Sequence, residues 1–481
     1  MPFLASFEKA GTPTVLMGYT EETRKIKHDS TIYGIPHLRL IEAHRSSPGP
    51  GEADKVMPML LDALTDPLTE EEKGSSRWEP EQPRILFEGS VDEAQDFYQQ
   101  VDNLPGILDA PFSRYTDGLP IIPPTEERVK AMLAGTSHKP DELIALQRDA
   151  VPMEGIRGVP GKKGDVVRFM PMSRTATVEQ VAVNAVMAGC KPEYFPVVLA
   201  IAESGGGTGD GRGGGGAFLV SGPIYKEIGM NVTNNIFGIG NPPNKAIGRV
   251  GSLMWRNLGG YQESVTTIIT IGSPIMNGGF VLAEYMEGLP EGWKGLNEEL
   301  GYKKDESIIM LVRPGAWGLG QEHMPGVYRS LQRTGHGAIA RYLDVKGIRG
   351  PHNYLEFLTK DIWACREDGF TLAMPPQIAQ DMYDYGFKTK QDIYEWIWKR
   401  SFEPLGEYRM RGRPDEHTNG WMGIEKTSGK RWKELSDDYM VPAGGSDPFA
   451  SYNIIVFNME ETQTARFGGG HGQSFSIDAW R

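Results

Sequence analysis

The stretch "TATVEQVAVNAVMAGCKPEYFPVVLAIAES", residues 175–204, decides the fold of this 481-residue chain. Thr177 and Gln180 have the spacing of a capping box, which predicts the start of a helix. Gly189 stands where that helix should end, in a position that favours a left-handed residue. Pro192 stands where a second helix should open. The stretch therefore predicts a helical hairpin.

A glycine-rich segment, "GGGTGDGRGGGG" at 205–216, follows the hairpin, and "AFLVSG" at 217–222 predicts a strand after it. Glycine-rich loops bind nucleotide phosphates when a strand leads in and a helix leads out. Here that order is reversed, and nine glycines in twelve residues match G-x-G-x-x-G by composition alone. We therefore expect a mobile loop and no nucleotide cofactor.

Outward from the hairpin, the sequence divides into three parts and predicts an α/β fold class. Residues 1–96 predict an α/β lobe, and 97–344 predict a larger mixed α+β core that holds the active site. Residues 345–481 predict a C-terminal α+β segment that packs on this core.

The N-terminal lobe shows strand and helix patterns in alternation. "TPTVLMGY" at 12–19 and "IPHLRLIEA" at 35–43 predict strands. Residues 52–68 predict an amphipathic helix. Its apolar stripe consists of Val56, Met57, Leu60, Leu61 and Leu64.

Charge and composition exclude several kinds of partner. The formal net charge of −13 argues against nucleic acid, because such binding depends on lysine and arginine neutralising phosphates. The N-terminus lacks the basic and apolar regions of a signal peptide, and no apolar stretch is long enough to span a bilayer. Two cysteines make neither a disulfide framework nor a four-thiolate metal site. We expect a cytoplasmic protein without nucleic-acid or membrane partners.

Several long motifs resemble a known family. "FEKAGTPTVLMGYTEE" (7–22) and "LLDALTDPL" (60–68) resemble part of the α/β domain in B-type subunits of glycine/betaine/sarcosine reductases, and more closely the related UGSC-motif (seleno)protein-like family. The likeness continues in the same order along the chain. Its further motifs are "YTDGLPIIPPTEERVKAMLAGT" (115–136), "VAVNAVMAGCKPEYFPVVLAIAE" (181–203), "SGPIYKEIGMN" (221–231), "NKAIGRVGSLMWRNLGG" (244–260) and "YNIIVFNME" (452–460).

The resemblance also implies a missing part. In those relatives a cysteine or selenocysteine lies in a U-G-S-C or T-G-S-C loop, just before the helix that leads into "EKAGTPTV". Met1 falls inside the corresponding helix, so the nucleophile and the first strand are lacking. This implies a truncated doubly wound lobe with an open sheet. We expect either a second protein subunit that supplies the strand and the Cys/Sec motif, or a homo-oligomer.

Two acidic residues are candidates for catalysis. Glu284 and Glu287, in "VLAEYMEGLPEGW" (281–293), fall where the resembling family carries an acidic run ahead of a tryptophan. Such a pair could bind a hard divalent metal, or act as acid and base if burial separates their pKa values. The alternative is a solvated acidic turn. The identity of any cofactor stays open.

The loop before a further predicted helix is a candidate anion site. Asn241 is placed as an N-cap, and prolines follow at the first helical positions. Exposed N–H groups there could hold a carboxylate or phosphate. The alternative is an ordinarily capped helix whose asparagines satisfy the loop backbone. The residues predicted to bind substrate here are Asn234, Asn235, Asn241, Asn244 and Lys245.

Three more residues have candidate roles, each with a structural alternative. Cys190, in a motif shared with the family, lies at a helix turn, where a thiol can have a lowered pKa or simply belong to the core. Four glycines flank His471, so its backbone could present the imidazole to a cleft; otherwise it is a surface residue. His37 follows a strand of the lobe, where substrates of open sheets bind, and is otherwise a hydrogen-bonded loop residue.

Three functions follow as alternatives. The first is a reductase-like enzyme subunit that acts on a small polar, carboxylate- or nitrogen-bearing organic substrate, with the nucleophilic thiol supplied by a partner chain. The second is a redox-inactive lyase or hydratase that uses Glu284, Glu287 and His471. The third is a non-catalytic scaffold subunit.

Overall fold

The structure, a computed structural model, describes the larger part of the chain. The described residues are 4, 7–8, 10–19, 23, 26–27, 30, 34–43, 53–73, 83–103, 111–150, 161–170, 174–205, 217–236, 238–261, 280–312, 328–329, 355, 369–411, 424–425, 428–442, 447–458, 464–467 and 469–481. The glycine-rich segment lies outside them except for its first residue, so the mobile loop stays a prediction.

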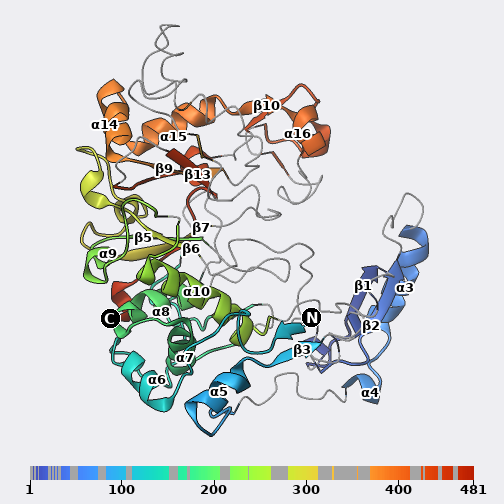
Figure 1. Cartoon of the computed structure of the whole chain (residues 1–481). Coiled ribbons are helices and arrows are strands. Elements are labelled where there is room, and N and C mark those ends of the chain that lie inside the picture. The colour runs from blue at the N-terminus through green and yellow to red at the C-terminus, as the bar shows by residue number, and fades with distance from the viewer. Residues whose placement is uncertain are drawn as a thin grey trace.

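The N-terminal lobe is a small parallel α/β unit, drawn in blue at the right of Figure 1. Strand β1 (Val15–Tyr19) pairs in parallel with β2 (Arg39–Ala43), and helix α3 (Ala53–Thr65) packs against both. The predicted strands and helix are confirmed. The apolar stripe of α3, however, is not covered. Its most exposed members are Met57, Leu61 and Leu64, at 51%, 53% and 46%.

Short elements lead from this lobe to the next layer. They are α4 (Glu70–Lys73), α5 (Val91–Tyr98), and the antiparallel strands β3 (Val101–Asn103) and β4 (Pro111–Ser113). Helix α5 begins with a complete capping box between Ser90 and Glu93.

A helical layer follows, mostly cyan and green in the lower part of Figure 1. It consists of α6 (Glu126–Leu133), α7 (Val178–Ala188), α8 (Phe195–Glu203) and α10 (Pro242–Asn257). The Thr177 hydroxyl accepts a hydrogen bond from the Gln180 N–H, and Gly189 ends α7 with a φ of 84°, as predicted. Pro192 opens a short 3-10 turn, so that α8 itself begins only at Phe195.

The first of two four-stranded sheets packs on this layer, in the order β14-β7-β5-β6. Strands β5 (Ala217–Ser221) and β6 (Phe280–Ala283) are parallel, and β7 (Ile308–Val312) is antiparallel to β5. The last strand, β14 (Ser474–Ser476), pairs with β7. The C-terminal part of the chain therefore completes a sheet that its middle part begins.

The second sheet has the order β12-β9-β13-β8. Strands β9 (Phe370–Met374) and β12 (Tyr452–Val456) are parallel, β13 (Thr464–Phe467) is antiparallel to β9, and β8 (Tyr328–Arg329) lies at the edge. Helices α14 (Pro376–Tyr385) and α15 (Lys390–Lys399) cover one face, in orange at the top of Figure 1.

The two sheets share a core, because side chains from the other face of the second sheet meet the first. Leu219 and Met310 from the first sheet pack with Ile455 from the second. The remaining elements are α9 (Ile224–Glu227), α11 (Leu296–Glu299), β10 (Phe402–Pro404), α16 (Leu405–Arg411), β11 (Met440–Pro442) and α18 (Pro448–Ser451). The described residues thus form a mixed α/β fold, and no helix among them is long and apolar enough to cross a membrane.

Candidate active site

Four ionisable side chains meet in the interior, and we call Glu284, Lys390, Glu299 and His471 the buried charge cluster. Glu284 follows β6, Glu299 ends α11, Lys390 begins α15, and His471 lies between β13 and β14. Their side chains expose between 0% and 8% of their surface. Taking ions out of water costs several kcal/mol each unless partners compensate for the lost hydration. Each member of the cluster therefore needs a partner.

Lys390 lies at the centre of the cluster. The capping box between Thr389 and Asp392 starts α15 and places Lys390 at its first helical position. The ammonium donates to Glu284 Oε1 at 3.0 Å and to Glu299 Oε2 at 3.1 Å. Burial alone disfavours the charged ammonium, but the two carboxylates outweigh it and raise the pKa of Lys390. Lys390 is therefore a buried cation.

Glu284 has donors on both carboxylate oxygens. Oε1 faces Lys390, while Oε2 accepts hydrogen bonds at 2.8 Å from the Ser221 hydroxyl and at 2.8 Å from the Leu296 N–H. The Asn297 side chain holds the adjacent loop in place, because its amide donates hydrogen bonds to three loop carbonyls between 303 and 306. A carboxylate held in this way orients Lys390.

Glu299 connects the lysine to the histidine. Besides Lys390, it accepts a hydrogen bond from the Tyr394 hydroxyl at 3.1 Å. Burial opposes the charged carboxylate, but the charge of Lys390 and the nearby His471 ring outweigh it and lower the pKa of Glu299. Burial and the Glu299 charge together raise the pKa of Tyr394 well above its ordinary value. Glu299 is thus an anion beside a neutral tyrosine.

The two ring nitrogens of His471 differ in their contacts. Nδ1 lies 2.7 Å from the Phe449 carbonyl oxygen, which can only accept, so Nδ1 carries a proton. Nε2 is buried, has no hydrogen-bond partner among the described residues, and lies 3.9 Å from Glu299 Oε2. The imidazole also stacks on the Phe449 ring, with centroids 4.2 Å apart. Nε2 is therefore the cluster nitrogen that the described contacts leave for a further hydrogen bond.

The glycines around His471 have a different role from the one that the sequence suggested. A Cβ on Gly470 would collide with the Ala450 carbonyl oxygen, and a Cβ on Gly472 would collide with the Leu311 carbonyl oxygen. The glycines let the loop pack directly on α18 and β7, which buries His471 instead of presenting it at the surface. The alternative of a surface histidine is therefore wrong.

Glu287 does not join Glu284. Its exposed carboxylate accepts a hydrogen bond from the Tyr225 hydroxyl and pairs with the Lys226 ammonium. Partial burial opposes the charge, but these two partners outweigh it and lower the pKa of Glu287. The two glutamates thus turn to different partners. In the part of the chain that the structure describes, no group of three or more His, Cys, Asp and Glu residues is placed to hold a metal ion.

The asparagines before α10 hold their own loop together. Asn241 precedes the helix, but its side chain makes no cap and instead donates to the Asn235 carbonyl at 2.9 Å. Asn244 accepts from the Asn231 N–H at 2.9 Å and donates to the Val281 carbonyl at 3.2 Å. These contacts match the alternative in which the asparagines satisfy loop backbone.

The other predicted substrate-binding residues lie around the same loop or away from it. Asn234 and Asn235 are exposed, and Lys245 is half-buried in the first turn of α10. Asn235 adopts a left-handed φ of 62°, a conformation that asparagine tolerates better than most residues. His37 is an exposed residue just before β2 in the N-terminal lobe. No contact brings any of them to the buried charge cluster among the described residues.

The environment of Cys190 disfavours a reactive thiol. The residue packs against the apolar core beneath α7, and burial raises the pKa of its thiol. A cysteine that belongs to the core therefore fits the structure better than a catalytic thiol. Cys365 lies outside the described residues.

Sequence reasoning selected Glu284 and His471 from this cluster and missed the rest. Lys390 and Glu299 occupy helix ends with several other charged neighbours, so nothing local marks them as buried. One weak signal existed, since "TKQDIYEWIWK" places a lysine beside the N-cap of an apolar helix.

Comparison with models of known protein families, with curated proteins and with solved structures gave no match to this chain. The resemblance to reductase-like proteins therefore stays an expectation.

Proposed function

We propose that this chain is an enzyme that performs acid–base chemistry on a small polar organic substrate, with His471 as the proton-exchanging group. This is the lyase- or hydratase-like alternative among the three functions above. The observation that supports it is His471 Nε2, a buried nitrogen without a partner among the described residues, 3.9 Å from a carboxylate. Buried polar atoms are nearly always paired, so an unpaired one is a functional candidate.

The neighbouring groups have positioning roles in this proposal. Glu299 stabilises the imidazolium that forms when Nε2 takes a proton, as a carboxylate beside a catalytic histidine does. Lys390 and Tyr394 hold Glu299, and Glu284 holds Lys390. With a neutral histidine the cluster contains two carboxylates and one ammonium, so its net charge is −1. A proton on Nε2 brings the net charge of the cluster to zero. The net charge therefore changes each time His471 gains or loses the transferred proton.

The proposal can be tested by solvent exchange. The full chain is incubated in D₂O with a panel of small hydroxy, keto and amino acids, and proton NMR follows the loss of C–H signals and the formation of new products. We expect exchange or turnover of at least one compound. His471→Gln should lower that rate by about 10²–10⁴-fold, the usual contribution of a general acid or base. Glu395→Gln, on the outer surface of α15, should leave it unchanged and serves as the control.

Two results would count against this function. Unchanged turnover in His471→Gln would remove the histidine from the mechanism. A folded wild-type chain that is inert to the whole panel would favour the scaffold alternative, in which the cluster only stabilises the packing of the two sheets.

A second proposal is the reductase-like subunit whose thiol comes from a partner chain. It is supported by the half-buried Cys190, whose raised pKa makes this cysteine a poor nucleophile, and by the exposed apolar stripe of α3. The test is co-purification followed by mass spectrometry of alkylated thiols. A partner with a Gly-Ser-Cys loop that is lost on Leu61→Glu would support it. A partner retained in that variant would contradict docking on α3.

A further inference from the structure

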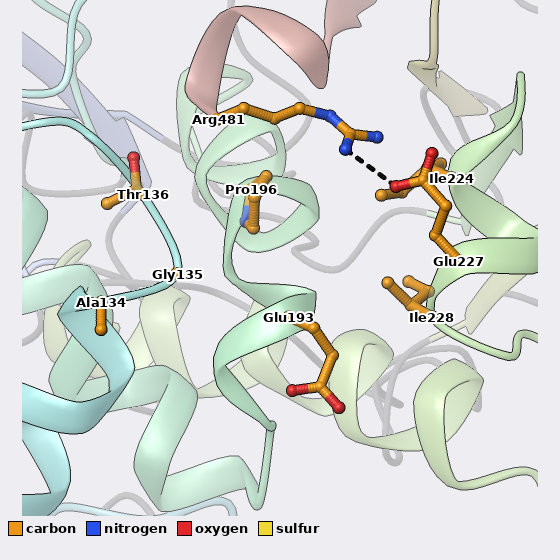
Figure 2. Close-up of a pocket in the computed structure, with 9 residues that line it drawn as sticks. All are labelled: Ala134, Gly135, Thr136, Glu193, Pro196, Ile224, Glu227, Ile228 and Arg481. Carbon is orange, nitrogen blue, oxygen red and sulfur yellow. Dashed lines mark hydrogen bonds and ion pairs between the residues drawn. The ribbon is translucent and has the colours of Figure 1, made fainter.

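A cavity of about 330 Å³ lies between the end of α6, the 3-10 turn before α8, and helix α9. Figure 2 shows the residues that line it. Small-molecule sites have volumes of about 300–1,000 Å³, so this cavity is large enough for a small ligand. No member of the buried charge cluster lines it. The lining residues are Ala134, Gly135, Thr136, Glu193, Pro196, Ile224, Glu227, Ile228 and Arg481.

The walls of the cavity are held in place by direct contacts. A Cβ on Gly135 would collide with the Pro192 carbonyl oxygen, so the end of α6 and the 3-10 turn touch through their backbones. The Thr136 hydroxyl donates to the Trp480 carbonyl at 2.6 Å, and the Trp480 indole is completely buried. A ligand therefore meets a preformed shape and loses little free energy in ordering the site.

One wall of the cavity is apolar. Pro196, Ile224 and Ile228 are all buried residues that turn part of their surface toward the space in Figure 2. An alkyl chain of a few carbons would displace water from this wall, which favours binding.

The charged groups of the lining sum to −1, since Glu193 and Glu227 are acidic and only Arg481 is basic. The Arg481 guanidinium is divided between Glu227, at 2.8 Å, and Asp478, at 2.7 Å. Among the described residues, the cation paired with Glu193 is the exposed Lys191 ammonium at 3.9 Å, a surface pair that contributes little. The Glu193 carboxylate can therefore accept a second cation.

Arg481 shows which kind of group the cavity accepts. It brings a planar cation on an alkyl stem to Glu227, and the hydrogen bond that Arg481 donates to this carboxylate raises the pKa of Arg481. A free ligand with the same two parts would find the same carboxylate and the apolar wall.

We propose that this cavity binds a small alkyl cation, a guanidinium or primary ammonium group on a short apolar chain. The cation lies between Glu193 and Glu227, the chain lies along Ile224 and Ile228, and Arg481 competes with the ligand for Glu227. This site is separate from the buried charge cluster and does not depend on the proposed acid–base function.

Isothermal titration calorimetry on the full chain tests the proposal, with n-butylguanidinium as the probe and n-butylurea as its neutral match in shape. We expect saturable binding of the cation with a Kd on the order of 1 mM, at least about tenfold tighter than the urea. Glu193→Gln should weaken the cation about fivefold, and Arg481→Gln should tighten it by removing the internal competitor. Glu291→Gln, exposed and outside the cavity lining, should change nothing.

Each contrary result would overturn the site. Equal binding of the guanidinium and the urea would show that the carboxylates do not recognise the cation. An unchanged Kd in Glu193→Gln, in a variant whose circular dichroism is that of the wild type, would place any binding elsewhere. Absence of saturation at about 50 mM would mean that the cavity is not a binding site.

Discussion

Replacing Glu203 by glutamine should remove a pH dependence of folding stability that the wild-type chain carries. Glu203 ends α8 and is 2% exposed. Its carboxylate accepts hydrogen bonds from the Gln147 N–H at 2.8 Å and from the Trp480 indole N–H at 2.6 Å. Burial disfavours the charged form and outweighs these two donors, so the pKa of Glu203 rises from its ordinary 4.5 to about 7.

The sign and size of the effect follow from this shift. A carboxyl group with a raised pKa in the folded state binds more protons when folded, so the free energy of unfolding falls as the pH rises. The contribution is complete below pH 4.5 and is lost as the pH rises through about 7. Each pKa unit corresponds to about 1.4 kcal/mol, so Glu203 accounts for a loss of about 3 kcal/mol over this range.

Urea unfolding followed by circular dichroism between about pH 4.5 and 8 measures this loss. The difference in unfolding free energy between wild type and Glu203→Gln should change by about 3 kcal/mol across the range. The glutamine side chain cannot accept hydrogen bonds from both N–H groups. This adds about 1–3 kcal/mol to the difference in unfolding free energy at every pH. The unfolding free energy of Glu395→Gln should depend on pH in the same way as that of the wild type. A difference that stays constant across the range for Glu203→Gln would refute the reasoning.

Four further outcomes are expected. Lys390→Met should lower the unfolding free energy by about 3–5 kcal/mol, because two buried carboxylates lose their cation, and adding Glu284→Gln should recover part of the loss in urea unfolding. Arg249→Ala should cost about 1–3 kcal/mol by thermal unfolding, because the guanidinium makes two 2.8 Å hydrogen bonds to the largely buried Asp117; no change would mean that this pair is solvent-screened. Cys190 should react with iodoacetamide much more slowly in the native chain than in urea, as followed by mass spectrometry, and equal rates would contradict the raised pKa of its thiol. The purified chain should have a mass above 53.2 kDa by light scattering, because the exposed stripe of α3 favours association, and a stable monomer would contradict this.

Local patterns in the sequence predicted the elements of the fold well. The capping box at Thr177, the left-handed Gly189 and the strand "AFLVSG" all appear in the structure close to the expected residues. These signals succeed because a cap or a turn is an interaction between residues only a few positions apart.

The candidate site was predicted only in part. Glu284 and His471 were selected for their unusual surroundings in the sequence. Glu287 was paired with Glu284, but its partner in the structure is Tyr225. The asparagines were assigned to substrate binding, but Asn241 bonds the loop backbone. An asparagine beside the start of a helix can use its side-chain amide either to bond loop backbone atoms or to bind an anion. The sequence could not separate these two uses, because the choice depends on which backbone atoms lie within reach.

By itself the sequence determined the α/β class and the place of several helices and strands, with the caps at Thr177 and Gly189. Only the tertiary structure decided that Lys390 lies between Glu284 and Glu299, 106 and 91 residues away along the chain. Only it decided that glycines around His471 bury the ring instead of exposing it. The physical reason is that a charge is buried when the packing of two sheets and a helix excludes water from it and supplies its partners. That packing is set by all of these elements together, and no short stretch of the chain contains it.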